Sequence, residues 1–575
     1  MADGMFIEIQ GDYCHVRGNG TGEAVVEDKQ ETWFQMDQER EKAHSNLFNV
    51  SSLCDQRISM ANKGSVCANT QYSTPQHWMQ NQLQEKDMIL HICESSRPED
   101  VQRQLFKVGK SPKEKPHNSF SLASLELLNN YGKVSKHVSN ETVSVIASAE
   151  DVRSKKLSVG EIVRVAGERY IQFSNQKFDG LSMFIHPYSS ALSNLSIEET
   201  ADVELVQHLL AAAELVGQEQ FDIASALITR CQWIASDIGN AVQRIVFYFA
   251  EALQQRIEIE TGRTTLDRIQ EQVAYQMKLQ VDFHVSFLEC HRVIPFSQVL
   301  QLAAVESIVE SFKTASKIHL IDLHIRSGIQ WTALMQALAE RFDNPLLKIS
   351  ALETTNKQHL EETGKRLMSF AQSMNISFSF HIVSVSDMKD LREEMFKREP
   401  DEAVAVYSSL ILRTMISNPD NLRSVMRAVR KLRPSIFVVI EVEANHNSPS
   451  FVSRFIESLF FYGAYFDCLE DCMERDNLHR KTIEGIYLGG GIRNIVGTEG
   501  DRRCTRNVKV EVWREYFTRF GMAEVELSES SLRQAYMVLK KFTKASGCTL
   551  TNNGKGLVIG WKGTPIHSLT TWKFL

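Results

Sequence analysis

The chain has 575 residues, of which 43% are hydrophobic and 23% are charged, and its formal net charge is −7. The composition is typical of a globular protein, and the length predicts more than one structural unit. The negative net charge gives no support for a protein that grips nucleic acid mainly by electrostatics, although it leaves room for a local basic patch.

The ten cysteines are scattered and include no CxxC pair, so neither a zinc ribbon nor a thioredoxin-type site is indicated. Cys468 and Cys472 share a face if their segment is helical, but two ligands do not make a metal site, and we expect no metal. The first residues lack an apolar signal-peptide core, and no apolar run reaches about 18 residues. We therefore expect reduced thiols in a cytosolic or nuclear protein.

Residues 1–140 are polar and weakly periodic, which predicts a mostly disordered arm with a few interaction segments. A small irregular domain is the alternative. Several lysines between 107 and 115 form a dilute basic cluster, which we interpret as a solvated linker, with a nuclear-import signal as the alternative. A short ordered lead-in is expected over 141–194, with order beginning near Ser158.

A helical block is predicted from about residue 196, because apolar residues recur at the i, i+3, i+4, i+7 spacing of one helix face. Three segments show this pattern: Val203 to Val216, Phe221 to Cys231, and Val242 to Leu253. Each amphipathic helix must bury its apolar stripe on a neighbour, either within the chain or on a partner.

From residue 318 strands and helices alternate. The predicted strands are 318–323, 346–350, 376–383, 403–407 and 436–442, and the predicted helices are 329–341, 356–373, 385–397, 420–431 and 449–462. Several strands are almost wholly apolar, as expected when helices cover both faces of a sheet. The alternation predicts an α/β fold with a doubly wound, mainly parallel sheet and a helical cap. A hairpin around Asn552-Asn553-Gly554 adds antiparallel strands, a layout that resembles S-adenosylmethionine methyltransferases.

The most informative stretch is the first of these strands with its loop and helix. Asp322 ends the strand and Glu353 follows the second one, which is where dinucleotide and methyltransferase folds place ligands. The loop 323–328, however, has Gly328 as its single glycine, whereas a phosphate or methionine group needs close backbone approach. Asp322 and Glu353 are therefore the candidate cofactor residues, and the alternative is that Asp322 caps the following helix or bonds the loop backbone.

Two further clusters carry polar chemistry. Glu441 and Glu443 end another predicted strand, and we interpret them as part of a capping network for the helix near Pro449, with a hydrolase or metal site as the alternative. The segment 490–506 carries arginines, including Arg502 and Arg503, and we interpret it as a solvated loop, with DNA contact as the alternative. No catalytic motif such as GxSxG, HExxH or a P-loop is present, and we expect no catalytic residue.

These motifs occur in the order found in the GRAS domain of plant transcriptional regulators, which residues 195–575 resemble. Ile318, His319, Leu320, Ile321 and Asp322 resemble the VHIID motif. Arg493, Trp513, Trp561 and Trp572 are the other motif positions that the resemblance carries over. It implies these regions: leucine-rich region I at about 203–262, VHIID at about 287–352, leucine-rich region II at about 359–391, PFYRE at about 403–496 and SAW at about 499–575.

The sequence departs from the family pattern in places. The closing Ser-Ala-Trp reads Thr570-Thr571-Trp572, and the PFYRE/SAW junction is blurred at Arg506-Asn507. The stretch 328–338 looks like the DELLA-side branches, yet the arm shows neither a DELLA nor a TVHYNP segment. Gibberellin-receptor capture is therefore not implied.

The resemblance implies a nuclear, non-catalytic transcriptional regulator without a cofactor. Its partners would be other GRAS proteins, in homo- or heterodimers, and DNA-binding transcription factors, with DNA contacted indirectly and no membrane. Plant development, hormone signalling and root symbiosis, including arbuscular mycorrhiza, are the processes it suggests. The alternative is an S-adenosylmethionine- or nucleotide-binding enzyme that uses Asp322 and Glu353.

Overall fold

The computed structural model describes a helical unit and an α/β unit that pack together. The described residues are 156–174, 195–265, 268, 283–312, 315–341, 345–354 and 357–575. The arm predicted over 1–140, its lysine cluster, and the parts of the lead-in 141–194 other than 156–174 lie outside them. No single helix among the described residues is long and apolar enough to cross a membrane, although a pair spanning Val285–Ser311, bent by 78°, meets that criterion jointly.

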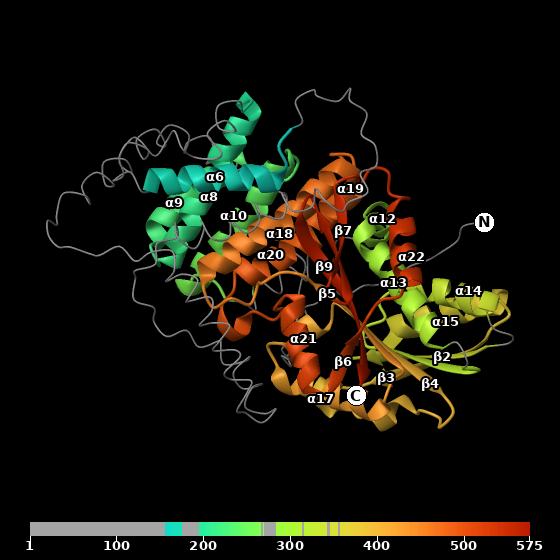
Figure 1. Ribbon diagram of the computed structural model, residues 1–575. Coiled ribbons are helices and arrows are strands. Elements are labelled where there is room, and N and C mark those ends of the chain that lie inside the picture. Colours follow the sequence, from blue (N-terminus) through green and yellow to red (C-terminus); the bar gives the residue numbers. More distant parts are fainter. Residues whose placement is uncertain are drawn as a thin grey trace, which may run out of the picture. The chain divides into compact units, whose positions relative to one another are not determined.

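One nine-stranded sheet organises the α/β unit (Figure 1). Its strands are β1 (Lys317–Asp322), β2 (Leu346–Glu353), β3 (Ser377–Ser384), β4 (Ala403–Ser409), β5 (Ile436–Val442), β6 (Met522–Val525), β7 (Cys548–Asn553), β8 (Gly556–Trp561) and β9 (Thr564–Phe574). The order is β3-β2-β1-β4-β5-β9-β8-β7, and β6 also pairs with β9. Strands β1 to β5 are parallel, whereas the pairings of β6 to β9 are antiparallel.

Helices cover both faces of this sheet, as the apolar strands predict. One face is covered by α12 (Phe283–Val293), α13 (Pro295–Ser311), α14 (Gln330–Arg341), α15 (Lys357–Ser373), α18 (Phe451–Cys472) and α22 (Glu529–Leu539). The other is covered by α16 (Leu412–Met415), α17 (Pro419–Leu432) and α21 (Val510–Arg519). Each face has its own apolar core, so the mainly parallel, doubly wound α/β fold is confirmed.

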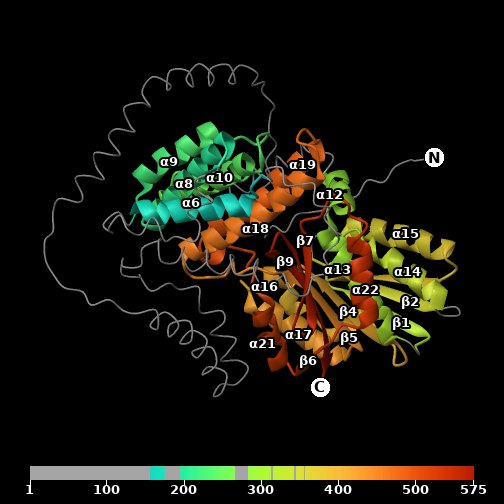
Figure 2. The same cartoon turned by 45° about the horizontal axis from the view of Figure 1, so that its top comes forward.

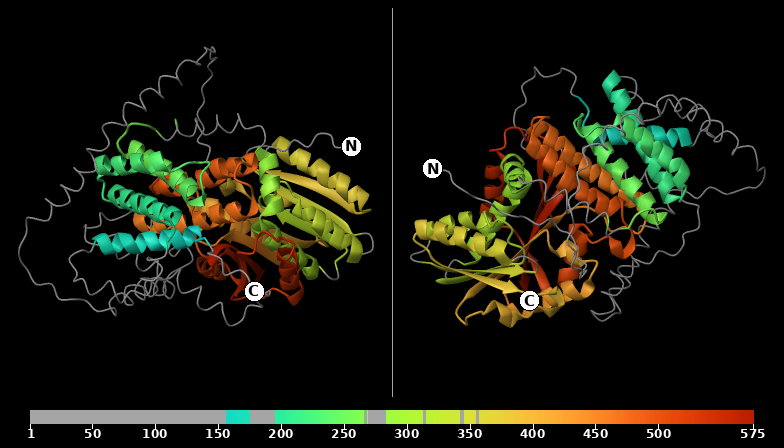
Figure 3. Two further views of the ribbon diagram at one scale, coloured as in Figure 1. Left: turned by 90° about the horizontal axis from the view of Figure 1, so that it is seen from above. Right: turned by 180° about the vertical axis from the view of Figure 1, so that it is seen from behind.

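Within the described residues, the predicted helical block forms three helices, and a helix from the lead-in joins them in a cap. They are α6 (Val159–Ser174), α8 (Ile197–Gly217), α9 (Phe221–Ile234) and α10 (Ala241–Glu260). Reciprocal hydrogen bonds close the first turns of α8, between Ser196 and Glu199, and of α10, between Asn240 and Gln243. Figures 2 and 3 show the cap lying along α18, and both α6 and α10 contact that helix. The three amphipathic segments are therefore confirmed as helices, and much of their apolar surface is buried within the chain.

The helix predicted over 385–397 is wrong. The segment forms two short 3-10 turns, Met388–Asp390 and Glu393–Phe396, with Leu391 in an extended conformation between them. Val385, Leu391 and Phe396 are all buried in the core beneath α17. Their spacing of six and five residues would point Leu391 away from the other two on an α-helix, so burying all three prevents a continuous helix.

The C-terminal hairpin is confirmed by β7 and β8, which pair antiparallel across a turn at Gly554 with φ +58°. Such a φ is accessible to glycine at little cost. Strand β9 then pairs with β5, so the chain's last strand joins the antiparallel segment to the parallel sheet. The helix predicted over 449–462 continues further, to Cys472.

The chain also contains a helix with a wider turn. Residues Leu478–Thr482 form the short helix α19, Ile483–Leu488 continue as a π-helix, and Gly489–Val496 form α20. Helix α20 lies against both α10 and α18. π-helical turns often occur at functional positions, and the side chain of Glu484 from this turn is central to the network described below.

Candidate functional sites

Asp322 lies at the carboxyl end of β1, fully buried. Its Oδ1 accepts a hydrogen bond from the backbone N–H of His324 at 2.9 Å, and its Oδ2 accepts one from Trp331 Nε1 at 2.8 Å. Burial raises the pKa of Asp322 to about 7. Both oxygens therefore accept hydrogen bonds, one from the loop backbone and one from a side chain in the first turn of α14. Of the alternatives that the sequence left open, Asp322 thus bonds the loop backbone.

Apolar side chains fill the space next to this carboxylate. Ile325 is buried, and Trp331 packs edge-on against Tyr407 with ring centroids 4.8 Å apart. Gly328 has a φ of +67°, and a Cβ there would lie 3.2 Å from Thr363 Cγ2 and 3.3 Å from a methyl carbon of Leu367. The absence of a side chain at Gly328 therefore allows α15 to pack closely against the loop, and it does not leave room for a ligand.

Glu353 ends β2 at the same edge of the sheet, and its backbone carbonyl accepts a hydrogen bond from Val385 at 2.9 Å. The structure thus brings Asp322 and Glu353 to one edge, as predicted. A nucleotide or methionine group would need backbone free to approach it, however. The packed loop 323–328 and the engaged Asp322 carboxylate do not fit such a group.

The histidine of the VHIID-like motif forms a polar chain inside the sheet. His319 Nδ1 lies 2.9 Å from Glu402 Oε2, and His319 Nε2 lies 2.8 Å from Ser350 Oγ. Burial lowers the pKa of His319 to about 4, so the ring is neutral at pH 7. The connectivity is that of a Ser-His-carboxylate triad, but Ser350 is fully buried. These hydrogen-bonded side chains therefore connect β1, β2 and the residue before β4, and the serine hydroxyl is not accessible as a nucleophile.

Glu441 and Glu443 cap two different helices. Glu441 Oε1 accepts from the backbone N–H of Leu412 at 2.8 Å, at the start of α16, and Glu443 Oε2 accepts from that of Val510 at 3.0 Å, at the start of α21. Burial raises the pKa of each carboxyl group to about 7. The prediction that these carboxylates cap helices is therefore confirmed. The prediction that they cap the helix near Pro449 is wrong, because that helix, α18, is capped by Ser450.

The arginine segment near residue 500 is largely internal, contrary to the prediction of a solvated loop. Arg503 is buried and donates from Nη1 to the carbonyl of His446 at 3.0 Å. Arg506 is also buried and donates to Asn447 Oδ1 at 3.2 Å. Burial lowers the pKa of Arg503 to about 9. These two arginines hold the loop after β5, so Arg503 is not placed to contact DNA, while Arg502 is exposed.

The motif tryptophans lie in the core. Trp513 stacks on Phe517, and Trp572 packs edge-on against the same ring. Trp561 Nε1 donates to Asp467 Oδ2 at 2.8 Å, which links β8 to α18. Arg493 on α20 is half-buried and lies beside the π-helical turn, donating to the carbonyl of Gly485 at 3.4 Å. The three tryptophans are thus buried, whereas Arg493 is partly accessible.

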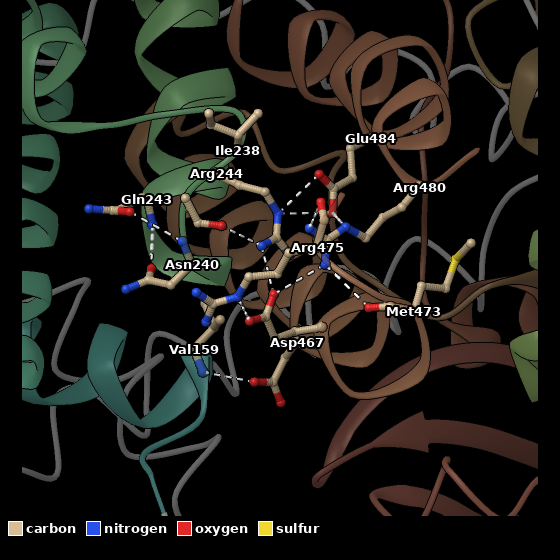
Figure 4. A network of polar contacts seen from close by, with 12 residues as sticks. Val159, Ile238, Asn240, Gln243, Arg244, Asp467, Met473, Arg475, Arg480 and Glu484 are labelled. Atoms are coloured by element: carbon tan, nitrogen blue, oxygen red, sulfur yellow. Dashed lines mark hydrogen bonds and ion pairs between the residues drawn. The ribbon is translucent and has the colours of Figure 1, made fainter. Parts of the chain in front are cut away.

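A buried ion network joins the cap to the α/β unit, and the sequence interpretation missed it (Figure 4). Arg244 on α10 is fully buried, with Nε 3.1 Å from both carboxylate oxygens of Glu484 and Nη1 2.7 Å from Glu470 Oε2. Arg480 Nη1 also lies 3.3 Å from that Glu470 oxygen. Burial raises the pKa of Glu484 to about 7 although both arginines lower it. Arg244 lies on the opposite face of α10 from the predicted apolar stripe of Val242 to Leu253, so the sequence pattern indicated an exposed side chain there.

Among the residues that the structure describes, no group of three or more histidine, cysteine or acidic side chains is arranged to hold a metal ion. Cys468 and Cys472 do share a face of α18, and their sulfur atoms lie 3.9 Å apart. Both are buried free thiols. As a pair on one helix they lack the further ligands that a structural zinc site takes.

The outer face of the cap exposes large apolar side chains. Helix α9 exposes Ile223, Trp233 and Ile234, and the following turn exposes Ile238, whose side chain is 68% accessible. The buried side of the same helix carries Ala224, Ile228 and Cys231. Helix α9 therefore has an apolar inner face that packs on α8 and α10 and a partly apolar outer face. Exposed apolar patches of this kind mark interaction surfaces in proteins.

Comparisons with known proteins agree with this architecture. Residues 205–573 match the model of the GRAS domain family. DELLA protein GAI1 of Vitis vinifera is 32% identical over 376 residues, which are 64% of this chain and 62% of that relative. DELLA protein 2 of Medicago truncatula is 32% identical over 400 residues, which are 68% of this chain and 72% of that relative. The crystal structure of SCL7 of Oryza sativa superposes with a TM-score of 0.57 at 27% identity, covering 64% of this chain and 99% of that one. The chain thus spans less than two thirds of the length of the Vitis relative.

Proposed function

Because this chain belongs to the GRAS domain family, whose members are non-catalytic transcriptional regulators that act through protein partners, we propose that it regulates transcription in the plant nucleus by binding other proteins. The observation that supports binding over catalysis is the contrast between its two candidate surfaces. The carboxyl edge of β1 is filled by its own loop, whereas the outer face of α9 exposes Ile223 and Ile234. Partner binding needs an accessible apolar face, and catalysis needs an accessible polar one.

We propose that α9 and the turn after it contact another GRAS protein, in a homo- or heterodimer. The exposed side chains are large and aliphatic or aromatic, which are the residues that anchor protein interfaces. DNA-binding transcription factors would be the second class of partner, so that DNA is contacted indirectly. The burial of Arg503 and Arg506 supports the indirect mode, because it removes two cations from the segment first considered for phosphate contact.

The similarity to DELLA proteins supports a role in plant development or hormone signalling, and root symbiosis, including arbuscular mycorrhiza, is a further process we propose. We also propose the region boundaries of leucine-rich regions I and II, VHIID, PFYRE and SAW as given by the resemblance. On these boundaries, leucine-rich region I coincides with α8 to α10, and the SAW region with α21 to β9.

The experiment is analytical ultracentrifugation of the full chain and of the Ile223→Asp/Ile234→Asp variant. If α9 is the dimer face, the wild type should form dimers and the variant should be monomeric, since an aspartate in an apolar interface must be desolvated. Met537→Asp on α22 is the matched control, because Met537 is 56% exposed on a different helix. A variant that associates as the wild type does would refute the α9 interface.

The same purified chain tests the enzyme alternative. Titration with S-adenosylmethionine and with common nucleotides should give no saturable binding, because the loop 323–328 is packed. Saturable binding that Asp322→Asn weakens would overturn the non-catalytic proposal.

A further inference from the structure

The exposed face of α17 carries a row of arginines. Arg423, Arg427 and Arg430 follow one another at i, i+4 and i+7, so their side chains share one face of the helix. Arg433 comes directly after the helix. Arg427, Arg430 and Arg433 are exposed, while Leu422, Val425, Met426 and Val429 point into the core. The row is thus the outer side of a helix whose inner side is held firmly by the sheet.

Acidic side chains of the described residues pair with two cations of this helix but not with the three exposed arginines. Asp420 pairs with Arg423 at 2.8 Å, and Glu393 pairs with Lys431 at 2.6 Å. Within the described part of the chain, Arg427, Arg430 and Arg433 have no acidic side-chain oxygen within 4.0 Å. The donors of the three guanidinium groups are therefore not taken up by acidic side chains of the described residues.

Two features of the backbone fix this surface in place. Arg433 adopts a left-handed conformation with φ +45° and ends α17. Arg398 Nη1 donates to the carbonyl of Leu432 at 2.8 Å, which brings one more arginine to the end of the helix. The partial negative charge at the C-terminus of α17 favours cations in its last turn, where Arg430 and Lys431 lie. Arg427, however, lies in the turn before the last turn. The helix dipole alone therefore does not account for the row.

We propose that the Arg427-Arg430-Arg433 surface binds an acidic segment of a protein partner, one with carboxylates at every third or fourth residue. A guanidinium group presents a planar fork of donors that matches a carboxylate. An acidic helix repeats its carboxylates at the same spacing as the arginines of α17, about 4.5 to 6 Å along the axis. This proposal rests on the proposed function in protein binding, and it adds a surface separate from α9.

Nucleic acid is the less suitable occupant. Specific DNA complexes usually bury roughly 1,000 Å² or more of protein surface and involve many phosphates, whereas this surface offers two unpaired arginines on one helix and a third directly after it. The net charge of −7 also repels a DNA duplex, whose phosphates are many and densely spaced, more strongly than it repels a short acidic peptide. An acidic peptide makes only the local contacts that the row supplies.

The test measures fluorescence anisotropy of a labelled poly-glutamate peptide with the full chain. The wild type should bind the peptide, and added salt should weaken the binding. The variant Arg427→Glu/Arg430→Glu/Arg433→Glu should bind at least about tenfold more weakly, since three attractive contacts become repulsive. The matched control, Arg533→Glu/Lys540→Glu/Lys541→Glu, makes the same change of net charge with exposed residues of α22 and of the turn after it, and should bind as the wild type does.

The circular dichroism spectrum and melting temperature of both variants establish that they are folded. Equal loss of peptide binding in both variants would show that only net charge matters and would overturn the proposal. So would a labelled DNA duplex that binds the wild type more tightly than the peptide and loses that binding in the α17 variant. A wild-type chain that binds the peptide but stays monomeric would instead refute the proposed dimer face alone.

Discussion

Asp322 at the end of β1 and Glu484 in the π-helical turn are both buried carboxyl groups with a pKa raised to about 7, but they are held in different ways. The partners of Asp322 lie two and nine positions away in the sequence. The principal partner of Glu484 is Arg244, 240 positions away. The first carboxylate organises one loop and one helix, whereas the second connects the helical cap to the rest of the domain. Buried polar groups in this chain therefore serve either local or long-range structure, and burial alone does not make them a ligand site.

The largest expected effect comes from breaking the long-range network. Arg244→Met should lower the free energy of unfolding by about 3 kcal/mol or more, because it leaves Glu484 buried without its closest cation. Urea unfolding followed by tryptophan fluorescence measures the change. Arg475→Met is the control: its side chain is 56% exposed, it pairs with the same Glu470, and its loss should cost less than about 1 kcal/mol. Equal costs for the two variants would contradict the special role of Arg244.

The local site should respond to pH. Asp322→Asn should destabilise the fold by about 1–3 kcal/mol, because an amide nitrogen cannot accept either of the two hydrogen bonds that the carboxyl oxygens, protonated or not, accept from His324 and Trp331. The folded pKa of Asp322, about 7, lies above its unfolded value, so the stabilisation that the wild-type carboxyl group provides is complete at low pH and is lost as the pH rises through 7. The cost of the substitution should thus be greater at about pH 5 than at about pH 8. A cost that does not change between these pH values would argue against the raised pKa.

A smaller effect is expected at the loop glycine. Gly328→Ala should cost about 1–2 kcal/mol, since φ is +67° and the new Cβ would press on Thr363 and Leu367. Differential scanning calorimetry measures the loss. Gly262→Ala is a useful control because its φ is +71° but no atom of the described residues lies within 4 Å of the added Cβ. The difference between the two variants isolates the packing of α15 against the loop, and no difference would show that this packing is loose.

The smallest effect on folding is expected on the outer face of the cap. Ile234→Asp should change the free energy of unfolding of the monomer by about 0.5 kcal/mol or less, because the side chain is already 44% exposed. The measurement is urea unfolding at a protein concentration where the chain is monomeric. A loss comparable to that of Arg244→Met would mean that Ile234 is needed for the fold and would remove the reason to regard α9 as a surface for partners.

The sequence by itself determined the elements whose signal is local. The period of apolar residues predicted α8, α9 and α10, the apolar runs predicted β1 to β5, and Asn552-Asn553-Gly554 predicted the β7–β8 hairpin. The motif order, with Ile318 to Asp322 at its centre, also indicated the family. Each of these signals lies within a few neighbouring residues, because helix and strand periodicity and turn geometry depend on local backbone conformation.

Only the tertiary structure decided what the polar residues do. It showed that Asp322 is closed in by Trp331 and the α15 packing, that Glu441 and Glu443 cap α16 and α21, and that Arg503 is internal. It also replaced the predicted helix 385–397 with two short turns. In each case the outcome depends on contacts between distant segments. The free energy of burying a charge or an apolar side chain is set by the neighbours that folding brings to it, and the local sequence does not contain those neighbours.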